Sequence, residues 1–190
     1  DRPSFDKFSE AAGVSFKYFE TKLNEDTVEL AAGFDGVCAF VNDTVDAAVC
    51  YLDSINYLLY PSDVKRMLKR LHLFVSPGGM LIFDINTPHK LKNLDNQVFL
   101  DEKDDVYCVW RTEYEKRSRI VTYGMDIFQR TGKDLWERSF EEHREYAYSV
   151  EQLTAWLREA GFTTVEVYGD RSFEAPQPGE QRIYFYAQKG

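Results

Sequence analysis

Two hydrophobic patterns divide the chain into an α/β part and a part made of strands alone. Short apolar runs at 37–41, 47–52 and 80–85 are bounded by polar residues and glycines, as in strands buried within a parallel sheet. A stripe of apolar residues with the period of a helix lies over 62–75. From 105 to 148 the pattern changes to long alternating stretches, which predict an antiparallel meander.

After this meander the mixed pattern returns. A capped helix is predicted over 149–160, and strands follow over 162–168 and 182–188. Strands that alternate with helices indicate an α/β fold: an open, doubly wound, mostly parallel sheet of the Rossmann or flavodoxin-like type. An antiparallel β cap over about 97–148 interrupts this sheet, and we expect the whole chain, 1–190, to form a single domain.

Two of the buried runs lie close together in the sequence. Only a few residues separate 37–41 from 47–52, whereas a parallel crossover needs about a dozen or more. The two strands are therefore either antiparallel to each other or placed in different layers. We expect residues 37–41 or 49–52 to occupy the centre of the sheet, flanked by strands over 14–20 and 80–85.

Composition excludes several classes of protein. Of the 190 residues, 44% are hydrophobic and 29% are charged, which excludes a disordered tail and a membrane protein. The net charge of −9 argues against nucleic acid or an anionic membrane as a partner, because no positive field would attract phosphates. Three cysteines and three histidines without ligand spacing predict no metal site. The cysteines indicate free thiols in a reducing, cytoplasmic location.

From about residue 46 to residue 190 the chain resembles the C-terminal part of a class I S-adenosylmethionine-dependent methyltransferase. The matching motifs, in order, are DAAVCYLDSINYL from Asp46, VSPGG from Val75, FDINT from Phe83, EEHREYAY from Glu141 and AGF from Ala160. The resemblance implies S-adenosylmethionine as cofactor, an unidentified small-molecule methyl acceptor, and an antiparallel pair formed by the last two strands.

Residues 1 to about 45 resemble a different family. They are similar to the start of the flavodoxin-like domain of a D-lactate dehydrogenase, mainly through the run VCAFVND from Val37. Two parents joined within a domain imply an engineered chimera, with its junction at 42–49. Dehydrogenase activity is excluded, because that family's cofactor loop and catalytic residues lie later in its chain than the piece present here.

The glycines bear directly on activity. The chain has 11 glycines but no G-x-G, whereas the methyltransferase family binds its cofactor with a glycine-rich turn, where a Cβ would clash. The first hypothesis is therefore a chimera whose methyl-transfer activity is weak or lost. A second is an active S-adenosylmethionine-dependent methyltransferase acting on a small-molecule acceptor. A third is a non-enzymatic scaffold that forms a homodimer through an unpaired sheet edge.

Candidate cofactor residues follow the predicted strand that ends at Leu52. By the resemblance, Leu52, Asp53 and Asn56 line the cofactor pocket. The residues themselves leave a second interpretation open, in which Asp53 or Ser54 caps the next helix. Asn86, at the end of the next strand, is a candidate substrate residue or belongs to a turn before Thr87-Pro88.

Candidate acceptor residues lie in the predicted cap. His143 is placed to act as a base toward the acceptor, or is a hydrogen-bonded histidine of the cap. Trp110 and Tyr114, together with Tyr123, either floor an acceptor pocket or belong to the core, since aromatic residues at strand spacing are often buried.

Overall fold

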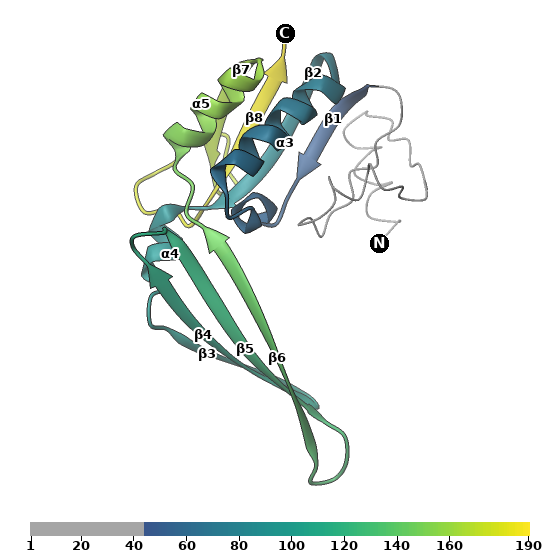
Figure 1. Ribbon diagram of the computed structural model, residues 1–190, viewed down its shortest axis with the longest axis vertical. Helices are drawn as coiled ribbons and strands as arrows, with labels where there is room; N and C mark the ends of the chain where they lie inside the picture. The colour runs from purple at the N-terminus through teal and green to yellow at the C-terminus, as the bar shows by residue number, and fades with distance from the viewer. Residues whose placement is uncertain (1–43) are drawn as a thin grey trace.

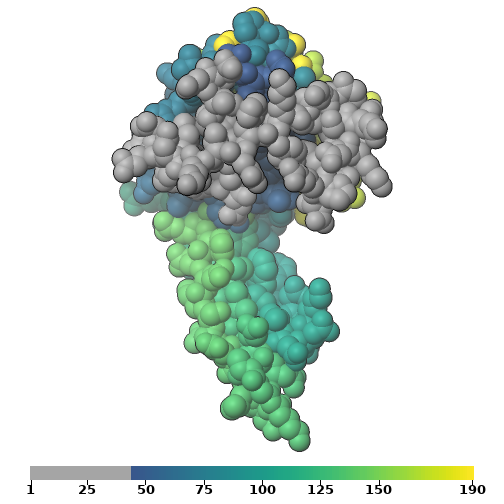
Figure 2. Space-filling view, turned by 90° about the vertical axis from the view of Figure 1, so that its right-hand side faces the viewer, coloured from purple at the N-terminus to yellow at the C-terminus, as the bar shows by residue number. Residues whose placement is uncertain are grey.

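The computed structural model describes residues 44–190, which form an α/β body and a separate four-stranded sheet, called the cap below (Figure 1). The cap extends away from the body as a narrow projection, which is also visible after a 90° turn (Figure 2). No helix within 44–190 is long and apolar enough to cross a membrane. The predicted strands at 14–20 and 37–41 lie outside the described residues.

The body consists of one sheet with helices packed on it. Its elements are β1 (Val45–Cys50), the 3-10 helix η1 (Ser54–Tyr57), α3 (Pro61–Phe74), β2 (Val75–Asn86), α4 (Pro88–Asn93), α5 (Val150–Ala160), β7 (Phe162–Gly169) and β8 (Arg182–Lys189). The strand order is β1-β2-β8-β7. β1 pairs with β2 in parallel, whereas the β2–β8 and β7–β8 pairs are antiparallel.

This topology corrects the predicted sheet in two ways. The antiparallel pair formed by the last two strands is confirmed, but a mostly parallel, flavodoxin-like sheet is not, because β8 runs back between β2 and β7. β1 lies beside β2 as expected, with Val49 opposite Ile82. It ends at Cys50 rather than Leu52, because Leu52 and Asp53 have φ angles of 59° and 51°, a left-handed backbone that no strand continues.

The main core lies between the sheet and the helices α3 and α5. The predicted apolar stripe of α3 is confirmed, since Val64, Met67, Leu68 and Leu71 are all buried. These side chains pack with residues of β2 and β8 in one cluster, in which the rings of Phe83 and Phe185 stack with their centroids 4.7 Å apart. Burial of this apolar surface is the main source of stability for the body.

Helix α5 begins and ends where its sequence predicts. Ser149 and Gln152 form the reciprocal capping box, in which each side chain accepts from the backbone N–H of the other residue. Gly161 ends the helix at a φ of 113°, and a Cβ at this position would lie 2.7 Å from His72 Nε2. Both the backbone conformation and the close approach therefore require glycine here.

The cap is the antiparallel meander that the alternating pattern predicts, with longer strands. It consists of β3 (Val98–Lys103), β4 (Val106–Glu115), β5 (Ile120–Arg130) and β6 (Trp136–Tyr146), in sequential order. Thr112, Tyr123 and His143 lie opposite one another on adjacent strands. Directly opposed residues and those two positions apart share a face, so Trp110 and Glu145 lie on the same side, called the His143 face below.

A small second core joins the cap to the body. Leu91 of α4 packs with Tyr114, Val121 and Ala147, all of which are buried. Thr87 caps α4 by accepting a hydrogen bond from the backbone N–H of Lys90. The base of the cap is thus fixed, whereas most residues toward its far end are exposed.

Candidate functional site

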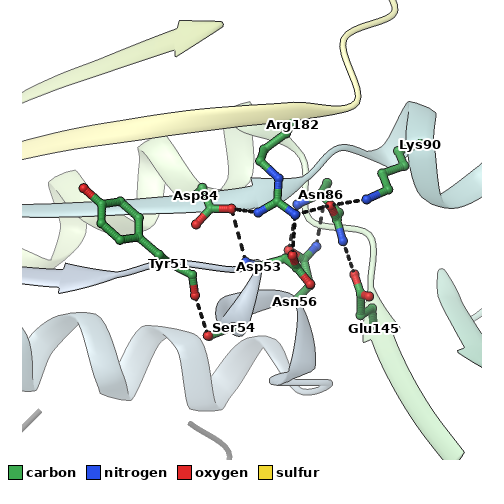
Figure 3. A network of polar contacts seen from close by, with 9 residues as sticks. All are labelled: Tyr51, Asp53, Ser54, Asn56, Asp84, Asn86, Lys90, Glu145 and Arg182. Atoms are coloured by element: carbon green, nitrogen blue, oxygen red, sulfur yellow. Dashed lines mark hydrogen bonds and ion pairs between the residues drawn. The ribbon is translucent and has the colours of Figure 1, made fainter. Parts of the chain in front are cut away.

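The carboxyl ends of β1 and β2 bring two aspartates together around one arginine. Arg182, at the start of β8, forms ion pairs with Asp53 and with Asp84 (Figure 3). The backbone N–H of Asp53 donates to Asp84 Oδ2 at 3.2 Å. The side chain of Asp84 is only 1% exposed, and its Oδ1 has no hydrogen-bond partner among the described residues. Arg182 is therefore the main compensation for two carboxylates of like charge.

Asn56 connects the three segments that meet beneath this acidic pair. Its Nδ2 donates to the carbonyl oxygens of Asn86 and Tyr146 at 3.1 and 3.0 Å, and its Oδ1 accepts from the backbone N–H of Asn86 at 3.0 Å. The residue is fully buried. Its hydrogen-bonding groups are engaged within the protein, so Asn56 supports the segments beneath the acidic pair.

Asn86 is also buried and occupies the centre of the polar network in Figure 3. Its Nδ2 donates to Glu145 Oε2 at 2.8 Å. Its Oδ1 accepts from Lys90 Nζ at 2.8 Å and from Arg182 Nη2 at 3.3 Å. Asn86 thus links the acidic pair to the cap. This role differs from both roles that the sequence suggests, a substrate contact and a turn residue.

Glu145, like Asp84, is a buried acid, and it lies at the base of the His143 face. Burial raises the pKa of Glu145, although the hydrogen bond from Asn86 opposes this shift. Burial also raises the pKa of Tyr123, and the neighbouring charge of Glu145 adds to the effect. Tyr123 therefore remains a protonated hydroxyl throughout the physiological pH range.

We expect Glu145→Gln to change how the free energy of unfolding depends on pH. The folded-state pKa of Glu145 is raised above 4.5, so the native protein holds this proton more tightly than the unfolded chain does. The resulting stabilisation is fully present below the unfolded pKa and is lost as the pH rises through the folded pKa. Urea unfolding at about pH 4, 5.5 and 7 should show the wild type losing stability relative to the variant as the pH rises.

Glu142→Gln is the matched control for this pH experiment. Glu142 is exposed and lies on the opposite face of β6, one position away from His143. This substitution should leave the pH profile of the wild type unchanged. Parallel profiles for the wild type and Glu145→Gln would show that burial does not shift the titration of Glu145.

Apolar side chains are exposed beside the acidic pair. The consecutive left-handed residues Leu52 and Asp53 turn the chain sharply, and Leu52 is 77% exposed. Tyr51 and Tyr57 are also exposed, and Ser54 Oγ donates to the carbonyl oxygen of Tyr51 at 2.7 Å. An apolar, exposed turn at the carboxyl end of a parallel strand is where α/β sheets bind ligands.

The structure decides one of the alternatives for Asp53. The side chain of Asp53 makes no capping hydrogen bond to η1, so the reading in which it caps the following helix is wrong. Its carboxylate is held by Arg182 instead. Arg182 was not predicted as a site residue, because it lies 129 positions away from Asp53 and only the antiparallel return of β8 brings the two together.

The acceptor candidates are divided between the middle and the base of the cap. His143, Tyr123 and Trp110 share the His143 face, and the ring of Tyr57 meets that of His143 edge-on at 6.0 Å between centroids. The ring of Tyr114, in contrast, is in the second core and is 7% exposed. His143 therefore lies beside the exposed turn that follows β1, whereas Tyr114 serves packing at this position.

His143 has one acidic neighbour on its own strand. Its Nε2 lies 3.4 Å from Glu141 Oε2, and both side chains are accessible to solvent. An accessible imidazole beside a carboxylate can accept a proton from a bound molecule. Among residues 44–190, no group of three or more His, Cys, Asp or Glu side chains could hold a metal ion.

Two relatives match the chain over most of its length, while no family model matches it. A protein of Geobacillus sp. (strain WCH70), provisionally named a methyltransferase, is 28% identical over 182 residues, which cover 95% of the chain and 68% of that protein. YqeM of Bacillus subtilis (strain 168), with the same provisional name, is 29% identical over 168 residues, which cover 88% of the chain and 64% of that protein. The chain thus spans about two thirds of the length of each relative.

The alignment with the Geobacillus protein also bears on the predicted chimera. Because it covers 95% of the chain, it must include most of residues 1–45, the segment in which the sequence indicates a D-lactate dehydrogenase. One methyltransferase relative therefore extends across the predicted junction at 42–49. None of the comparisons supports a dehydrogenase part or a second parent.

A solved structure shows the same fold. An S-adenosylmethionine-dependent methyltransferase from Clostridium acetobutylicum ATCC 824 superposes with a TM-score of 0.73 at 24% identity, over 97% of this chain and 69% of that one. The body sheet, with its antiparallel β7–β8 pair, and the interposed cap are thus features of a methyltransferase Rossmann-like fold. The chain is thus similar in sequence to the two relatives and shares its fold with this structure.

Proposed function

We propose that this chain transfers methyl groups from S-adenosylmethionine to a small-molecule acceptor, with the cofactor bound at the exposed turn after β1. The observation that carries the proposal is the pairing of an exposed apolar turn, Leu52 and its neighbours, with the acidic pair of Asp53 and the buried Asp84. We therefore propose an active enzyme and not the chimera with weak or lost activity, since a methyltransferase relative aligns across the predicted junction.

The residues at this edge fit the proposed cofactor in shape and charge. Leu52 and Tyr51 offer apolar surface to a flat nucleoside, and the acidic pair favours a positively charged ligand. The buried Oδ1 of Asp84, which accepts no hydrogen bond within the described residues, is an unused acceptor at the same place. When bound, S-adenosylmethionine supplies a methyl group that is already activated on a sulfonium.

Residues of this chain would then position the acceptor next to the cofactor and exclude water. Arg182 holds Asp53 in a fixed orientation at the cofactor edge. Trp110 and Tyr123 present aromatic surface on the His143 face, against which an acceptor can pack. With Nε2–H directed at Glu141 Oε2, His143 would accept the proton of the acceptor nucleophile at Nδ1, and Glu141 would stabilise the resulting imidazolium.

Calorimetric titration with S-adenosylmethionine tests the proposal, and Leu52→Gly locates the site. Glycine adopts the φ of 59° without strain, so this variant should be at least as stable as the wild type. It removes an apolar side chain that the bound cofactor would cover, and burial of such a side chain contributes about 1.5 kcal/mol to the binding free energy. The affinity for the cofactor should therefore fall about tenfold.

Asn96→Gly is the control for this backbone effect. Asn96 also has a left-handed backbone, with a φ of 54°, but it lies between α4 and the cap. Its substitution should leave cofactor affinity unchanged. A wild type that binds no cofactor would refute the proposed function, whereas unchanged affinity in Leu52→Gly would place the cofactor elsewhere.

The homodimeric scaffold gains no support from the described residues. It requires an unpaired edge next to β1, and the residues before position 44 lie outside the described part of the chain.

A further inference from the structure

A second recess lies at the base of the cap, apart from the residues of Figure 3. It has a volume of about 460 Å³ and is lined by Lys92, Asp95, Tyr114, Lys116 and Arg119. Lys92 lies in the last turn of α4, and Lys116 and Arg119 lie in the turn that joins β4 to β5. None of these residues takes part in the polar network around Asn86, so the recess is a separate feature.

Positive charge is concentrated in this recess. Three of its lining side chains are cationic and one is anionic, on a chain whose net charge is −9. The ammonium groups of Lys92 and Lys116 form no ion pair or hydrogen bond within residues 44–190. The single carboxylate, Asp95, accepts a hydrogen bond from the backbone N–H of Tyr114 at 2.9 Å. The recess therefore has uncompensated positive charge.

The third cation is already held in place. Arg119 donates to the carbonyl oxygen of Ala147 and, at 3.0 Å, to Gln152 Oε1. Its guanidinium also lies over the ring of Tyr146, 5.4 Å from the centroid. Because these contacts fix its orientation, Arg119 loses little conformational freedom when it binds an anion.

Tyr114 adds a hydroxyl group that is held equally firmly. Its side chain is 7% exposed, because the ring packs against Leu91 and Val121 in the second core. Tyr114 lines the recess, and its hydroxyl forms no hydrogen bond with any described residue. A buried aromatic ring with a free hydroxyl at the wall of a recess is a ready hydrogen-bond donor for a ligand.

We propose that this recess binds a small molecule through a phosphate or carboxylate group. Lys92 and Lys116 would supply point charges, Arg119 a guanidinium that hydrogen-bonds anionic oxygens, and Tyr114 a neutral donor. With a volume of about 460 Å³, the recess is large enough for a small metabolite. This binding site goes beyond the proposed methyl transfer and does not depend on it, since it shares no residue with the cofactor edge.

Titration with inorganic phosphate tests this site, at an ionic strength kept constant with sodium chloride. Amide shifts in a 1H–15N spectrum should saturate for residues around Tyr114. Lys116→Gln and Tyr114→Phe should each weaken the affinity about threefold to fivefold, as expected for loss of one exposed charge or one hydrogen bond. Tyr114→Phe keeps the ring, so its thermal stability should match that of the wild type.

Lys133→Gln is the matched control, because Lys133 is exposed in the β5–β6 turn at the far end of the cap. It should leave the phosphate titration unchanged. A parallel titration with succinate distinguishes the two sources of anionic oxygen: the tighter ligand identifies the class. Non-saturating shifts with both probes, or equal affinity in the wild type and Lys116→Gln, would overturn the proposal. S-adenosylmethionine is absent throughout, so failure of the proposed function would not affect this result.

Discussion

Replacing Asn56 with alanine is expected to lower the free energy of unfolding by about 3–5 kcal/mol. The substitution leaves the backbone N–H and carbonyl of the buried Asn86 without the side chain that pairs with them, while the carbonyl of Tyr146 still accepts from the backbone N–H of Tyr148. Each buried polar group left unsatisfied costs about 1–3 kcal/mol. Urea unfolding followed by circular dichroism would measure the loss.

Asn93→Ala is the matched control, because it makes the same substitution at an exposed position. Asn93 is exposed at the end of α4, and its side chain contacts only His89 among the described residues, at 2.9 Å. Its substitution should cost less than about 0.5 kcal/mol. A similar small loss in Asn56→Ala would mean that water enters the site and replaces the lost hydrogen bonds.

Replacing Arg182 with methionine is expected to lower the free energy of unfolding by a similar amount, about 3–5 kcal/mol. Methionine keeps much of the apolar stem but leaves Asp84 buried, beside Asp53, without a compensating charge. Removing one partner of a buried ion pair is costly for this reason. Arg117→Met, in the exposed β4–β5 turn, should have little effect.

A double substitution separates charge from packing at this position. In Arg182→Met combined with Asp84→Asn, the buried charge disappears together with its partner. Part of the lost stability should then return, which gives a favourable coupling between the two substitutions in a double-mutant cycle. A double variant as unstable as Arg182→Met alone would show that the loss comes from packing and not from charge.

Local patterns predicted much of the fold. The capping box and terminal glycine of α5 and the apolar stripe of α3 lie within single turns or helices, so their residues are neighbours in the sequence. The alternating stretches from 105 to 148 likewise identify β4, β5 and β6, whereas β3 lies before them and was not predicted as a strand. The mostly parallel sheet was not confirmed, because pairing depends on which strands meet in space and β8 is inserted between β2 and β7.

The candidate site was predicted only in part. Leu52 and Asp53 lie at the edge where the resemblance places them, yet their left-handed conformation carries no glycine or asparagine signal in the sequence. Asn56 is a buried support, although its type and position suggest a ligand contact. Arg182 could not be predicted as a site residue, because a single arginine at the start of a strand indicates a site only when the two aspartates are known to lie beside it.

The three hydrogen bonds of Asn56 also couple the two proposed ligand sites, the cofactor edge and the His143 face. One side chain holds the end of β2, which belongs to the cofactor edge, and the end of β6, which carries the His143 face. An acceptor that tilts the cap when it binds must lengthen or shorten these hydrogen bonds of Asn56. It would therefore alter the affinity of the cofactor edge for the cofactor. Thermodynamic reciprocity then requires that the cofactor alter acceptor affinity by the same factor.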